Sequence, residues 1–216
     1  MTFALGIFEL FTYAIPGAMQ LAVLLYLAVR LDLVDWSQIT SASGVLQLAA
    51  VLIASYLLGH TTYVVSGLVD RVTTFGFRKD ASDAWEKVAG AAQRAGAPAV
   101  PRMDVMLLLA RIQLSHLDAA AEISRFRATG LMLRSAVVPM AAATTVAMVE
   151  SIAGPRHLLA MTCTVLSAFI AIGFAWYGQK MRFWANTKTF EFACWTGVAH
   201  PPGESGQPLD GKSAAA

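Results

Sequence analysis

The stretch Leu158–Tyr177, LLAMTCTVLSAFIAIGFAWY, contains no Asp, Glu, Lys or Arg. An α-helix rises about 1.5 Å per residue, so about 20 residues are enough to cross the roughly 30 Å hydrocarbon layer of a bilayer. This stretch therefore predicts a transmembrane helix. The composition of the whole chain agrees, because 56% of its 216 residues are hydrophobic and only 14% are charged, against about 25% charged in soluble domains.

Three further stretches are long and apolar enough to cross a membrane: Phe11–Val29, Gly44–Val69 and Leu131–Val149. The run Val105–Ala110 is too short to cross and belongs to a soluble segment. We therefore expect an all-α integral membrane protein with four transmembrane helices. The first span has no convincing cleavage site and should remain in the protein.

The basic residues are distributed unevenly about these four spans. Of the sixteen Lys and Arg residues, all except Arg30 and Arg156 fall on the side that holds both termini. Cytoplasmic loops of membrane proteins carry the excess of positive charge. The sequence predicts a multi-pass protein of the plasma membrane with both termini in the cytoplasm and two short external connections.

This topology divides the chain into five parts. Residues 1–70 hold the first two spans and residues 131–177 the last two. Residues 71–130 should form a helical cytosolic segment, and residues 178–200 a cytosolic helical extension of the fourth span. These two parts would together make a helical cytosolic cap. Residues 201–216 are rich in Pro, Gly, Ser and Ala and are expected to be disordered.

Breakers and caps predict three helices within residues 71–130. A short amphipathic helix around Trp85 should end at the Gly- and Pro-containing residues 96–101. Asp104 can cap a second helix. A third should begin near Ser115, where Ser115 and Asp118 match a capping box, and should continue into the third span.

Polar side chains within the spans are the candidate functional residues, because keeping such groups in hydrocarbon is costly unless they meet water or a partner. Glu9 and Arg134 should each lie roughly 10 Å from the cytoplasmic surface at 1.5 Å per residue, so the two side chains can pair. Alternatively, the Arg134 side chain extends along the span and places its guanidinium at that surface. Glu150 lies near the external end of its span, where water can hydrate it, and receives little functional weight.

His60 is the other candidate, about 15 Å in from Asp70 and at the depth of Tyr13. With Glu9 and Arg134 these residues suggest a polar line from the cytosol to mid-membrane, which would suit a proton or ion path and its gate. The alternative is that the same groups only hold helices together. The four histidines show no metal-ligand spacing, and the sequence predicts no metal site and no cofactor.

Small residues recur at four-residue spacing on three of the spans. The first series is Ala50, Ala54 and then Leu58, with Ser55 and Gly59 beside them; the others are Ala143, Ala147 and Ser151, and Ser167, Ala171 and Ala175. Such ridges let membrane helices approach closely. They favour a homo-oligomer, although alanine is common throughout this chain.

The hexapeptide Arg111-Ile112-Gln113-Leu114-Ser115-His116 fits the Arg-x4-6-His pattern of HEPN ribonucleases. With the four-span plan, Arg111 and His116 give the chain a resemblance to small prokaryotic membrane accessory proteins of antiviral, CRISPR-associated systems, whose cytosolic part is a degenerate HEPN-like domain. The resemblance implies a bacterial inner-membrane homo-oligomer that perturbs the membrane when a cytosolic cue arrives. Other motifs of catalysis are missing from the sequence, so we do not expect an enzyme.

Two functions remain open. The chain is expected to act as a channel-like or membrane-perturbing effector, with antiviral defence as its setting. The alternative is a non-conducting anchor or sensor subunit that recruits a cytosolic protein partner. Nine basic and six acidic residues between Arg71 and Gly130 leave a net charge of +3, which suits anionic lipid heads and is too small to argue for nucleic acid. An enzyme acting on lipid or RNA ranks third.

Overall fold

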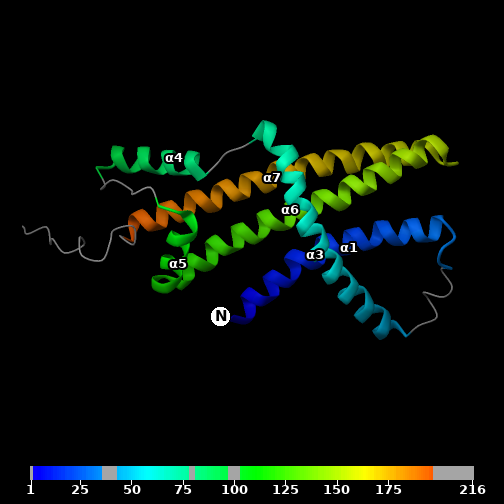
Figure 1. Ribbon diagram of the computed structural model, residues 1–216, viewed down its shortest axis with the longest axis horizontal. Helices are drawn as coiled ribbons and strands as arrows, with labels where there is room; N and C mark the ends of the chain where they lie inside the picture. Colours follow the sequence, from blue (N-terminus) through cyan, green and yellow to red (C-terminus); the bar gives the residue numbers. More distant parts are fainter. Residues whose placement is uncertain (1, 36–42, 78–80, 97–102, 197–216) are drawn as a thin grey trace, which may run out of the picture. The chain divides into compact units, whose positions relative to one another are not determined.

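The computed structural model describes the backbone of residues 2–35, 43–77, 81–96 and 103–196, and the side chains of the same ranges except residues 2–9 and 68–77. All regular structure in these residues is helical (Figure 1). The helices are α1 (Thr2–Arg30), α3 (Gly44–Phe77), α4 (Ala81–Arg94), α5 (Val105–Ser115), α6 (Leu117–Ala153) and α7 (His157–Trp195).

Four of these helices, α1, α3, α6 and α7, are long and apolar enough to cross a membrane. The predicted all-α class and its four candidate spans are therefore confirmed. Large apolar side chains are exposed along all four helices, such as Leu24 on α1, Ile53 on α3, Ile152 on α6 and Phe169 on α7. A lipid bilayer is the environment that such surfaces require.

The chain divides into two compact units. The first comprises residues 1–78 and 125–182, and the second residues 79–124 and 183–216. Both α6 and α7 run without a break from one unit into the other. Both helices therefore extend beyond the predicted spans Leu131–Val149 and Leu158–Tyr177.

In the first unit, α1 and α3 cross at two glycines. A Cβ atom on Gly17 would overlap the carbonyl oxygen of Ser55 and lie 2.6 Å from the Gly59 nitrogen. A Cβ on Gly59 would overlap the carbonyl oxygen of Tyr13. Only glycine permits this approach of two backbones, which is the usual role of small residues between membrane helices.

The face of α3 that is buried carries small residues at helical spacing, namely Gly59 and the hydroxyl residues Ser55, Thr62 and Ser66. The hydroxyl of Thr62 donates to the carbonyl of Gly59 at 2.7 Å, and that of Ser66 donates to Tyr63 at 2.7 Å. These two hydroxyls are satisfied within their own helix, so their burial leaves no unpaired donor.

Helices α6 and α7 pack in the same unit through another pair of glycines. A Cβ on Gly130 would lie 3.3 Å from the carbonyl oxygen of Gly178. Further along, the Thr144 hydroxyl donates to the Ser167 hydroxyl at 2.9 Å. Small residues and the Thr144–Ser167 hydrogen bond therefore join these helices, and Ser167 belongs to a ridge predicted from the sequence.

The second unit has its own hydrophobic core. It contains Ala84, Val88 and Ala92 of α4, Leu108, Leu109 and Ile112 of α5, Ala120 and Ile123 of α6, and Phe190 and Ala193 of α7. Leu108, Ile112 and Ile123 are completely buried. An apolar cluster contributed by four helices gives this unit a packed interior of its own.

The ends of the shorter helices follow the predicted signals in two of three places. Helix α4 ends just before Gly96, whose φ of +69° favours glycine. The side chain of Asp104 accepts a hydrogen bond from the Met106 N–H at 2.8 Å, as an N-cap does. The predicted capping box at Ser115 and Asp118 is wrong, because Ser115 ends α5 and its hydroxyl donates to the Arg111 carbonyl at 2.9 Å.

Candidate functional site

The crossing of α1 and α3 brings four aromatic side chains together. The ring of Tyr13 lies 4.4 Å from that of His60, 6.3 Å from Tyr56 and 5.9 Å from Tyr63, measured between ring centroids. The rings of Tyr56 and His60 are 5.0 Å apart. Tyr13 and His60, which the sequence places at one level, thus lie next to each other. We call these four residues the Tyr–His cluster.

Sequence reasoning overlooked Tyr56 and Tyr63. They lie four residues before His60 and three after it, so the three side chains share one face of α3. This spacing was visible in the sequence. The backbone of Gly59 on α3 contacts the backbone of Tyr13 on α1. This contact brings the Tyr13 ring to the three side chains of α3.

The Tyr–His cluster has an open side. His60 is exposed, and Tyr56 and Tyr63 are 39% and 44% exposed. At 1.5 Å per residue, His60 lies about 10 Å inside the candidate span that ends at Gly67. An imidazole and two phenols at this depth present donors and acceptors to their surroundings, which hydrocarbon does not satisfy.

Two polar atoms near the crossing are buried without a hydrogen-bond partner in the described part of the chain: Ser55 Oγ and Gln20 Oε1. Ser55 is 2% exposed, and its carbonyl oxygen is the atom that Gly17 approaches. Buried polar atoms normally have a partner, and water commonly supplies it. The crossing thus combines tight backbone contact with unused hydrogen-bonding capacity.

The other predicted intramembrane residues are described to different extents. Glu9 falls within α1, but its side chain lies outside the described residues, so its pairing with Arg134 stays a prediction. Arg134 is partly buried on α6, and its Cγ lies 2.8 Å from the Cβ position of Gly178. The aliphatic stem of Arg134 therefore packs against α7, where a larger residue at position 178 would displace it.

A second charged site was not predicted from the sequence. Arg30, the last residue of α1, pairs with Glu150 on α6 through Nε to Oε2 and Nη2 to Oε1, both at 3.4 Å. The Glu150 carboxylate also lies over Gly154, whose Cβ would be 2.5 Å from Oε1. This pair joins the C-terminal ends of α1 and α6.

The HEPN-like residues lie at the junction of two helices. Arg111 is partly buried in α5, whereas His116 is exposed and forms the C-cap of that helix. The backbone N–H of His116 donates to the Ile112 carbonyl at 2.7 Å. Arg111 therefore lies within α5, whereas His116 lies directly after its last residue.

Chemically, the Tyr–His cluster offers an imidazole beside three phenols, a combination of hydrogen-bond donors and acceptors that can bind water and pass protons. The Arg30–Glu150 pair offers one charge of each sign at the end of two spans. Comparisons with protein families, with curated proteins and with solved structures give no match to this chain.

Proposed function

We propose that the chain assembles with further copies of itself in a membrane and acts as a channel-like or membrane-perturbing effector that responds to a cytosolic cue. In this proposal the Tyr–His cluster faces the interior of the assembly. The single observation that carries it is the exposure of His60 about 10 Å inside a span.

Two kinds of surroundings satisfy an imidazole at that depth. One is a neighbouring protein surface that donates or accepts hydrogen bonds, and the other is water in a path between subunits. Lipid tails offer neither. Further copies of the chain supply the aromatic and hydroxyl groups of their own Tyr56 and Tyr63, and they enclose the water that a conducting path needs.

The orientation and setting belong to the same proposal. The distribution of Lys and Arg favours both termini in the cytoplasm. The second unit, with its own core, would then form the cytosolic cap that receives the cue. The resemblance in plan to membrane proteins of antiviral systems suggests a bacterial inner membrane and a cue that arises during infection.

The test is conductance in planar bilayers, together with the oligomeric state from light scattering in detergent. The wild-type protein should form a ring of four or more subunits and conduct ions. His60→Leu should abolish or greatly reduce conductance. Thr61→Leu is the matched control, because Thr61 is exposed on the same helix and its hydroxyl donates to the Leu58 carbonyl of that helix.

A monomeric wild-type protein, or equal conductance in the His60 and Thr61 variants, would contradict the proposal. Thermal unfolding separates the two roles of the cluster. If His60→Leu conducts normally but unfolds at a lower temperature, the histidine only joins helices.

One observation favours a second function, a non-conducting anchor or sensor that recruits a protein. Among its described residues, the second unit exposes six large apolar side chains: Met106, Leu107, Leu114, Leu117, Trp184 and Trp195. Apolar surface of this kind on a soluble face commonly marks a protein-binding site. Leu114→Ser with Leu117→Ser should leave conductance intact if the first function holds, and should abolish recruitment if the second does.

A further inference from the structure

A pocket opens in the first unit beside the Arg30–Glu150 pair. Its volume is about 330 Å³, and its lining comes from α1, α6 and α7. Most of the lining is apolar, including Ala22, Ala143 and Leu159. This volume lies at the lower end of the roughly 300–1,000 Å³ of small-molecule sites, so the pocket suits a slender apolar ligand.

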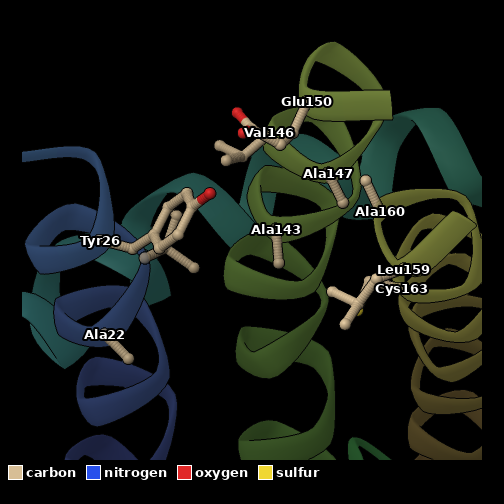
Figure 2. Close-up of a pocket in the computed structure, with 10 residues that line it drawn as sticks. Ala22, Tyr26, Ala143, Val146, Ala147, Glu150, Leu159, Ala160 and Cys163 are labelled. Atoms are coloured by element: carbon tan, nitrogen blue, oxygen red, sulfur yellow. The ribbon is translucent and has the colours of Figure 1, made fainter. Parts of the chain in front are cut away.

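The polar groups of the pocket lie at one end. Figure 2 shows the Tyr26 phenol oxygen and the Glu150 carboxylate toward the upper end of the view, with Ala22 well below them. Arg30 extends the polar end, because its guanidinium pairs with Glu150. One end therefore offers a cation, an anion and a hydroxyl, and the rest offers only apolar contact.

The polar end also lies where lipid head groups lie. Arg30 is the final residue of the candidate span Leu10–Arg30. Ala22 is about 12 Å deeper along α1, and Ala143 about 10 Å deeper than Glu150 along α6, at 1.5 Å per residue. The pocket thus runs from the head-group region into the hydrocarbon, as a phospholipid does.

We propose that this pocket binds one phospholipid whose head group carries both a phosphate and a primary ammonium, as phosphatidylethanolamine does. The Arg30 guanidinium binds the phosphate, and the Glu150 carboxylate binds the ammonium. The upper part of one acyl chain occupies the space between α1, α6 and α7. In the proposed orientation this lipid belongs to the leaflet opposite the chain termini.

Charge complementarity selects this class of lipid. Both contacts of the Arg30–Glu150 pair are 3.4 Å long, against about 2.7–2.9 Å for a tight charge-assisted hydrogen bond. The Arg30 side chain is 52% exposed and that of Glu150 is 24% exposed, so both charges are accessible to a ligand. An anionic lipid without an ammonium would leave Glu150 facing negative charge, and a trimethylated ammonium has no N–H to donate to it.

Small residues of α6 leave room for the acyl chain in the proposed lipid site. Ala143 and Ala147 belong to a ridge that the sequence predicted for helix packing, yet both line the pocket. A larger side chain at either position would occupy the space of the acyl chain. The ridge therefore keeps the pocket open as well as permitting close helix contact.

The test is native mass spectrometry of the purified full-length chain, titrated with phosphatidylethanolamine, phosphatidylcholine or phosphatidylglycerol of identical acyl chains. Wild-type protein should retain the ethanolamine lipid about fivefold better than the other two, the upper range for a partly exposed charge pair. Glu150→Gln should remove this preference. Arg30→Gln should weaken the binding of all three lipids, because each contains the phosphate.

Matched controls separate lipid binding from folding. Arg156→Gln removes a charge that does not line the pocket and should leave the preference unchanged. Ala143→Leu should reduce the binding of every lipid, whereas Ala141→Leu, on an exposed face of α6 outside the pocket, should not. Circular dichroism and size-exclusion chromatography confirm that each variant is folded.

Three results would each overturn the proposal. The first is equal retention of the three lipids by the wild-type protein. The second is a preference for the ethanolamine lipid that persists in folded Glu150→Gln. The third is equal lipid binding by Ala143→Leu and Ala141→Leu, which would place the lipid elsewhere on the protein.

Discussion

Gly59 lies where α3 crosses α1, and its replacement by alanine should force these helices apart. The added Cβ would overlap the carbonyl oxygen of Tyr13 and lie 2.6 Å from the carbonyl carbon. Both atoms belong to the backbone, so no side-chain rotation relieves the contact. Because non-bonded carbon atoms are most stable at about 3.5–4.0 Å, the backbones must separate by about 1 Å or more.

Gly67 provides the matched control on the same helix. A Cβ there meets nothing within 4 Å. Alanine exceeds glycine in helix propensity by about 1 kcal/mol, so Gly67→Ala should be neutral or slightly stabilising. At Gly59 the same gain opposes an overpacking cost of typically about 1–3 kcal/mol, and the clash with backbone atoms puts this site at or above the upper end. The two variants should differ by at least about 2 kcal/mol.

Thermal unfolding in one detergent, followed by circular dichroism, measures this difference. For a chain of this size, 2 kcal/mol corresponds to a midpoint shift of about 4–8 °C. If Gly59→Ala unfolds at the same temperature as Gly67→Ala, α1 and α3 do not cross at this glycine, and the Tyr–His cluster is not built as described.

Three further predictions concern stability. Leu108→Ala in the core of the second unit should lower the free energy of unfolding by about 2–5 kcal/mol. Leu107→Ala, at a side chain that is 49% exposed, should lower it far less. Denaturant unfolding of the full chain measures both. Asp104→Ala removes the cap of α5 and should cost about 1 kcal/mol in the same unfolding experiment, whereas Asp104→Asn should retain most of the stability. Glu150→Gln should lower the thermal stability only slightly, because its pair with Arg30 is partly exposed, and this loss should shrink at high salt; a large loss that salt does not affect would contradict the prediction.

Part of the candidate site could be predicted from the sequence, because the position of a residue along a helix depends only on the number of residues between it and the end of that helix. Counting residues from the ends of two spans placed Tyr13 and His60 at one level, and the structure puts their rings 4.4 Å apart. The same counting, applied to one face of α3, would also have found Tyr56 and Tyr63. The Asp104 cap was predictable for the same reason, because donor and acceptor lie two residues apart.

The Arg30–Glu150 pair and its pocket were beyond such reasoning. The two residues are 120 positions apart, and each alone is an ordinary charge at the end of an apolar helix. Their meeting depends on how α1 and α6 are rotated about their axes. The same applies to Gly130 and Gly178, whose contact follows from the rotation of α6 against α7.

The sequence by itself determined that the chain is helical, that four of its helices suit a bilayer, and where two of the shorter helices begin or end. Each of these follows from the transfer of side chains between water and hydrocarbon or from bonds between near neighbours, and such effects add along the chain. Only the tertiary structure decided which faces meet: α1 against α3 at Gly17 and Gly59, Arg30 beside Glu150, and the pocket between α1, α6 and α7. The physical reason is that helix rotation and crossing depend on many weak contacts and on close steric fit between distant residues, which no local pattern specifies.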